Sequence, residues 1–292
     1  MWREATMLQR WSRSILDASR LGRQMKMEES RQVFGAFRNY AKVAAAAQTF
    51  VDYPGKGTSS KAEVNLNVMF WSKPRSLALA LDSPLRIEEP KYEGIRYFML
   101  KLLLFYSKQS KSIRGANVIY KRITAQIDKP AIYDVFQLEK TFKTTFSLLV
   151  LHMWLCLRRL KEEGKEGVEL GQYLYEIYYH DLELRVSKAG VNLLLAKWMK
   201  ELEKIFYGNI VAYDEAMVPH AKNDQLQTVL WRNVFSDDGN EMPNDGAAKA
   251  VQALSRYTRR ESTCLSLTGK EAVFYGNFMF TSILPESTKP GS

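Results

Sequence analysis

The longest apolar run of the chain lies between Phe142 and Arg159 and has the period of a helix. The stretch between Lys143 and Arg158 is shorter than the about 20 apolar residues that a membrane-spanning helix needs. Its largest side chains fall on one broad stripe, made of Phe142, Phe146, Leu149, Val150, Met153, Trp154, Leu157 and Leu160. This pattern predicts a central helix at about 139–163 that is buried from several directions.

Helical periodicity continues on both sides of this helix, and β-branched alternation is scarce. Pro130, Gly164 and Gly190 separate the periodic stretches. Further helices are predicted at 93–108, 113–127, 168–187, 193–217, 223–235 and 247–260. The segment 265–278 could be extended and pack back. The predicted fold class is therefore all-α, a single helical domain of about six to seven helices at 92–278.

The first 50 residues are rich in arginine, and their apolar positions fall on one helical side: Trp2, Leu8, Trp11, Ile15, Leu16 and Leu21. Basic amphipathic segments of this kind are typical of mitochondrial transit peptides, which are cleaved or disordered. A disordered basic tail is the alternative, since Glu4 and Asp17 depart from an acid-free presequence. Residues 51–91 contain four prolines and read as a linker with one short helix near 76–81, and residues 279–292 as a flexible tail.

The net charge of +10 is unevenly distributed. Nine Lys or Arg and four Asp or Glu give the first 50 residues a net charge of +5, so the remainder is only mildly basic. This weakens the case for nucleic acid, although a matrix RNA-binding protein stays open as an alternative. The two cysteines, Cys156 and Cys264, are too few for a disulfide framework and fit a reducing compartment.

No catalytic, cofactor-binding or metal-binding residue is assigned. His180 has Glu176 and Glu183 at helical spacing, as a metal site in a bundle requires, but no second segment supplies the other half. A helical metal-binding enzyme therefore remains only an alternative. His152 lies on an apolar helix and is expected to be a bonded core histidine. The adjacent acids at 214 and 215 face different directions on a helix, which favours a structural or partner-binding role.

Four segments of the chain resemble the ubiquinol-cytochrome c chaperone family, the assembly factors for cytochrome b of respiratory complex III. They occur in the family's order within 92–278: TFSLLVLHMWLCLRRLKEEGKEG at 145–167, IFYGNIVAYDEAM at 205–217, LWRNVF at 230–235 and LSLTGKEAVF at 265–274. The chain departs from the animal pattern at Ala216, where a glycine follows the acidic pair, and in a longer gap before Leu230.

The resemblance implies a non-enzymatic mitochondrial protein, associated with the matrix side of the inner membrane and without a small-molecule substrate. Its implied partners are newly made cytochrome b, a small partner subunit that forms a heterodimer and, in some organisms, the mitochondrial ribosome. Matching positions, together with Arg159 from the basic end of the central helix, give the expected partner-binding residues: Trp154, Arg158, Arg159, Tyr213, Asp214, Glu215, Trp231 and Arg232.

A chaperone for a membrane protein must cover apolar segments, which calls for an exposed groove. We expect that groove on the surface of the predicted helices at 139–163, 168–187 and 193–217, with Trp154 as an anchor.

Overall fold

The computed structural model describes residues 66, 69–88, 92–102, 106–190, 194–236 and 246–283. The predicted transit peptide at 1–50 lies outside these residues, as does most of the predicted tail. Within them, no helix is both long enough and apolar enough to cross a membrane.

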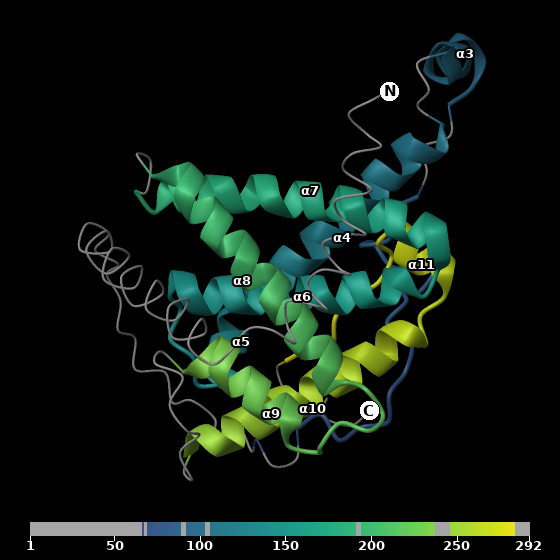
Figure 1. Ribbon diagram of the computed structural model, residues 1–292. Helices are drawn as coiled ribbons and strands as arrows, with labels where there is room; N and C mark the ends of the chain where they lie inside the picture. The colour runs from purple at the N-terminus through teal and green to yellow at the C-terminus, as the bar shows by residue number, and fades with distance from the viewer. Residues whose placement is uncertain are drawn as a thin grey trace, which may run out of the picture. The chain divides into compact units, whose positions relative to one another are not determined.

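The prediction of an all-α fold is confirmed (Figure 1). In chain order the helices are α3 (Gly94–Leu102), α4 (Lys108–Ile127), α5 (Pro130–Val135), α6 (Phe142–Lys161), α7 (Gly164–Lys188), α8 (Leu195–Ala216), α9 (Gln225–Leu230), the π-helical turn η1 (Trp231–Phe235), α10 (Gly246–Ser266) and α11 (Lys270–Phe274). The helix expected at 223–235 is thus α9 followed by η1.

Local capping chemistry explains several helix ends. The Ser107 hydroxyl accepts a hydrogen bond from the Ser110 N–H at 3.1 Å, so α4 begins five residues earlier than periodicity alone suggests. Pro130 does not simply stop a helix but occupies the first turn of α5, where its missing N–H costs nothing. Gly164 has a φ of +65°, which lets the chain reverse between α6 and α7.

The short helix expected near 76–81 is wrong. Ala78 instead forms an antiparallel bridge with Phe278. The N–H of Leu77 donates to the Thr268 hydroxyl at 2.9 Å, and the N–H of Leu79 donates to the Asn277 carbonyl at 2.9 Å. A stretch this short gains little as an isolated helix, so long-range hydrogen bonds decide its conformation. Although these residues fall in the range expected to be a linker, they are bonded into the fold.

The expectation for 265–278 is partly wrong. α10 continues to Ser266, and α11 forms at Lys270–Phe274, so most of this segment is helical. Only its end is extended and packs back, through the bridge at Phe278.

The chain divides into two compact units, each described here by itself. Unit 1 contains Lys140–Leu151 and Arg185–Val251, and unit 2 contains Lys61–Glu139, His152–Leu184 and Gln252–Ser292. In unit 1, α9 packs on α8 (Figure 1). In unit 2, α11 packs on α4. A Cβ built at Gly115 of α4 would lie 2.0 Å from the carbonyl oxygen of Phe274, so this contact requires a glycine.

A buried polar network in unit 2 confirms that His152 is a bonded core histidine. Its Nε2 lies 2.9 Å from the Tyr257 hydroxyl, which also accepts a hydrogen bond from the Gln126 side-chain amide at 3.2 Å. Phe280 packs edge-on against the imidazole. Burial raises the pKa of Tyr257, and the nearby Glu261 carboxylate raises it further.

Glu261 belongs to the same network and is completely buried. Its carboxylate accepts hydrogen bonds from the Thr281 N–H at 3.1 Å and from Nη1 of Arg260 at 3.2 Å. Loss of water raises the pKa of Glu261, while these bonds oppose the rise. The buried Glu261 carboxylate thus attaches the segment after α11 to α10.

Candidate functional site

At the end of α8, three of the expected partner-binding residues point in different directions. Tyr213 is fully buried, Asp214 is half-buried and Glu215 is exposed. Successive helical residues point about 100° apart, so one apolar and two acidic positions reach different surroundings. Burial raises the pKa of the Tyr213 phenol. Tyr213 therefore holds α8 against its neighbours, while Glu215 faces outward.

The π-helical turn η1 is held in place from α6. The N–H of Ser236 donates to the Trp231 carbonyl at 2.8 Å, a bond one residue wider than in an α-helix. The Ser147 hydroxyl donates to the Asn233 carbonyl at 2.7 Å, and the Lys143 ammonium donates to the Ser236 carbonyl. Such turns are rare and occur often at functional sites. Its backbone is fixed by two side chains from one helix.

Fixing this turn determines where its side chains point. Val234 is buried, Trp231 and Phe235 stack at 6.1 Å between ring centroids, and Arg232 is exposed. The turn therefore presents a cation beside a half-buried aromatic pair.

An open hollow of about 770 Å³ lies between the end of α8, the following loop, α9 and η1; we call it the α8–α9 hollow. All of its lining residues belong to unit 1. They are Ala212, Glu215, Val218, His220, Ala221, Lys222, Asp224, Gln225, Thr228, Val229 and Arg232. Two of the eight expected partner-binding residues, Glu215 and Arg232, thus line one surface.

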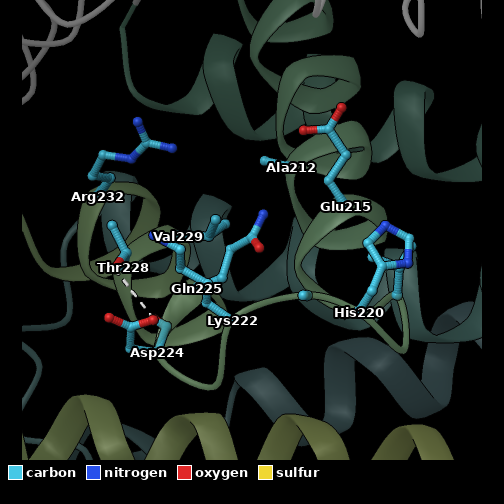
Figure 2. Close-up of a pocket in the computed structure, with 11 residues that line it drawn as sticks. Ala212, Glu215, His220, Lys222, Asp224, Gln225, Thr228, Val229 and Arg232 are labelled. Atoms are coloured by element: carbon cyan, nitrogen blue, oxygen red, sulfur yellow. Dashed lines mark hydrogen bonds between the residues drawn. The ribbon is translucent and has the colours of Figure 1, made fainter.

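Figure 2 shows how the labelled side chains lie around the hollow. Arg232 lies at one rim, and Glu215 and His220 lie at the other, with Gln225 and Val229 between them. The dashed line is the hydrogen bond from the Thr228 hydroxyl to the Asp224 carbonyl, at 3.2 Å, which stabilises the first turn of α9.

The α8–α9 hollow differs in chemistry from an enclosed small-molecule pocket. Enclosed small-molecule pockets are mostly apolar, with few placed polar groups. This hollow instead carries both signs of charge at its rim, from Glu215, Asp224, Lys222 and Arg232. In the part of the chain that the structure describes, no group of three or more His, Cys, Asp or Glu side chains could hold a metal ion.

Of the three expected partner-binding residues on α6, Trp154 and Arg159 are buried and Arg158 is half-buried, which corrects the assignment of the two buried ones. Trp154 is 1% exposed and belongs to the core of unit 2, so it cannot anchor a surface groove. Arg158 is half-buried, and its guanidinium lies 5.7 Å from the centroid of the Trp154 ring. Periodicity placed Trp154 correctly on the apolar stripe, but an exposed role had no support beyond the resemblance.

Arg159 stabilises the end of another helix. Its Nε donates to the Leu265 carbonyl at 2.9 Å, and its Nη2 donates to the Thr268 carbonyl at 3.0 Å. The same Nη2 lies 2.6 Å from Oε1 of Glu163. Carbonyls at a helix C-terminus lack intrahelical partners and carry partial negative charge, so a buried guanidinium there is favourable. Arg159 is a structural cap for α10 rather than a partner contact.

Most residues of the α8–α9 hollow were missed by sequence reasoning. Of the three helices expected to form a groove, only α8 lines it. The loop that carries His220 and Lys222 shows no spacing that predicts a site. Pro219 indicates that a helix has ended, but does not indicate that the chain then turns back to form a surface.

The structure thus combines a helical fold with an open hollow that has a charged rim. Comparison with known proteins then defines the family. The chain belongs to the ubiquinol-cytochrome C chaperone family, whose model matches residues 134–280. The matched residues include the whole α8–α9 hollow.

Several characterised relatives share this similarity. The chain is 26% identical over 188 residues to ubiquinol-cytochrome-c reductase complex assembly factor 1 of Xenopus laevis, covering 64% of this chain and 90% of the relative. It is 26% identical over 220 residues to the Homo sapiens protein of that name, covering 73% of this chain and 70% of the relative. It is 30% identical over 153 residues to mitochondrial protein CBP3 of Saccharomyces cerevisiae, covering 51% of this chain and 43% of the relative.

A solved structure supports the same assignment. The crystal structure of the Cbp3 homolog from Brucella abortus matches with a TM-score of 0.54 and 26% sequence identity. The match covers 63% of this chain and 97% of the bacterial chain. The similarity to this homolog is therefore one of fold as well as of sequence.

Proposed function

We propose that this protein is a mitochondrial assembly chaperone for ubiquinol-cytochrome c reductase, and that it binds newly made cytochrome b through the α8–α9 hollow. One observation carries the proposal. The hollow lies where 205–217 and 230–235, two of the segments that resemble the family, come together: they contribute Ala212, Glu215 and Arg232, and the family model also covers the other lining residues, at 218–229. Relatives across this family are named as assembly factors for that complex.

The form of the hollow supports binding of a polypeptide. Protein-binding surfaces combine a partly apolar centre with a polar rim, and charges at the rim select partners and orient them. Val229 and Gln225 lie between the charged groups of the rim (Figure 2). A loop or terminus of the client with both acidic and basic residues matches such a rim. No bond needs to be made or broken, so the proposed role is non-enzymatic.

The proposal includes the cellular setting. The protein acts in mitochondria, on the matrix side of the inner membrane, to which it binds peripherally. It works there as a heterodimer with a small partner subunit, and no small molecule is its substrate.

Charge reversal at the rim tests the binding role. Arg232→Glu should lower recovery of cytochrome b by at least about fivefold when the full-length protein is purified by affinity from mitochondria, the effect of about 1 kcal/mol. Lys200→Glu is the matched control, because Lys200 is also an exposed cation of unit 1, on α8, but does not line the hollow. Both variants should melt like the unmodified protein, since both sites are exposed.

The possible outcomes separate two failures. Equal recovery with Arg232→Glu and Lys200→Glu would mean that the hollow is not the binding site. If the unmodified protein recovers neither cytochrome b nor its assembly intermediates, the proposed client is wrong.

A further inference from the structure

Helix α3 exposes its apolar side. Ile95, Phe98, Met99 and Leu102 are 83%, 68%, 54% and 72% exposed. Their positions at i, i+3, i+4 and i+7 place all four on one stripe of the helix. A surface helix of a globular protein normally turns such a stripe toward the core. Because four large side chains on one stripe are too many for chance exposure, the stripe indicates a surface that something else covers.

The remaining positions of α3, outside the stripe, include its basic residues and a tyrosine. The rings of Tyr97 and Tyr106 lie 5.4 Å apart, and Leu100 is less exposed than its neighbours. The Lys101 ammonium lies 6.0 Å from the Tyr97 ring centroid. The helix sequence, GIRYFMLKL, contains two basic residues and no acidic one. α3 therefore combines an exposed apolar stripe with cations and a tyrosine beside it.

This combination favours a lipid bilayer over a protein as the occupant. An amphipathic helix with cations beside its apolar face lies in the interface of an anionic membrane, where tyrosine rings also concentrate. A helix of 9 residues is about 13 Å long, so it lies in the interface rather than crossing the membrane. The absence of acidic residues from α3 removes the repulsion that anionic headgroups would otherwise exert.

We propose that α3 binds the protein to anionic lipid by inserting the stripe Ile95, Phe98, Met99 and Leu102 between the headgroups. The inference rests on the peripheral membrane association proposed above and identifies the element that makes the contact. It does not involve the α8–α9 hollow.

A fluorophore attached at α3 tests this contact directly. A cysteine is introduced as Met99→Cys in the full-length protein and labelled with an environment-sensitive dye. The native Cys156 and Cys264 are buried, and burial raises the pKa of both thiols, so they react slowly. The matched control is Leu81→Cys, because Leu81 is an exposed leucine of unit 2 on a turn, 82% exposed.

Vesicles of phosphatidylcholine mixed with phosphatidylglycerol should shift the emission of the dye at position 99 to shorter wavelength and leave the dye at 81 unchanged. Pure phosphatidylcholine vesicles should have a much weaker effect. Adding Lys101→Gln to the labelled protein should raise the lipid concentration at half-maximal shift by about fivefold, the contribution of one cation near an anionic surface.

Other outcomes would overturn the proposal. If the protein sediments with anionic vesicles while the dye at 99 does not respond, another segment makes the contact. The basic residues 1–50 are one such segment. If the dye responds to protein concentration without lipid, a second copy of the chain covers α3. Because this experiment contains no cytochrome b, its failure is distinguishable from failure of the Arg232→Glu test.

Discussion

Replacing Arg159 with methionine should destabilise the protein strongly, although the residue was expected to contact a partner. Methionine keeps the apolar stem of the side chain and removes the guanidinium. The Leu265 and Thr268 carbonyls then lose their donors at 2.9 and 3.0 Å. Glu163 loses a cation at 2.6 Å.

The expected cost follows from these contacts. Each hydrogen bond from a charged group contributes about 1.5 kcal/mol or more, so the two carbonyl bonds account for about 3 kcal/mol. The Glu163 carboxylate is partly exposed and keeps Lys270 Nζ at 3.9 Å, so loss of its pairing adds at most about 1 kcal/mol. A free-energy loss of about 3–4 kcal/mol lowers the melting temperature of a chain of this size by roughly 10 °C.

Arg158→Met provides the matched control one residue away. Arg158 is half-buried, and its guanidinium lies 5.7 Å from the centroid of the Trp154 ring, so removing this cation–π contact should cost about 0.5–1 kcal/mol, or roughly 2 °C. Melting of both variants is followed by circular dichroism at one pH and one protein concentration. If Arg159→Met melts no lower than Arg158→Met, the cap on α10 contributes nothing, and Arg159 is free to act elsewhere.

Two further predictions concern unit 2 and a control position. The pKa of buried Glu261 is raised above its unfolded value of about 4.3, so the folded protein binds a proton at this carboxyl more tightly than the unfolded chain does. The tighter proton binding stabilises the fold at low pH, and this stabilisation is lost as the pH rises from about 4 through the folded pKa. The melting temperature of the unmodified protein relative to Glu261→Gln should therefore fall between pH 4 and neutrality; a constant difference would contradict this. Gly115→Ala should lower the melting temperature by several degrees, because the added Cβ would lie 2.0 Å from the Phe274 carbonyl oxygen. Gly208→Ala on α8 should raise the melting temperature, because a Cβ there has no other atom within 4 Å and alanine favours the helix. Thermal melts of both variants check this pair of predictions.

Periodicity predicted the long helices because the apolar stripe of each one continues along its whole length. The stripe around Trp154 gave α6 within three residues at its start and two at its end, and the same reasoning found α7 and α8. Such helices bury one face whatever their neighbours are, so local pattern and final packing agree. Short elements behave differently: α5 and α11 are stabilised by their packing on α4, and neither shows a stripe of its own.

The candidate site was only partly predictable. Resemblance identified Glu215 and Arg232, but nothing in the sequence shows that they line one hollow, since that depends on the turn after Pro219 and on the π-helical turn. Conversely, resemblance assigned Trp154 to a partner-binding surface, and the basic end of the central helix suggested the same for Arg159, whereas both side chains are buried. A matching position can reflect the needs of folding as well as the needs of binding.

The bridge between Ala78 and Phe278 has a consequence for synthesis of the chain. Residues 69–88 leave the ribosome early, yet their hydrogen-bond partners Thr268 and Asn277 lie 190 residues or more further along. The early segment therefore remains without these partners until translation is nearly complete. During that interval the unpaired backbone of residues 69–88 is accessible to chaperones and proteases. A chain truncated before Thr268 should accumulate in that incomplete state, with residues 69–88 never attached.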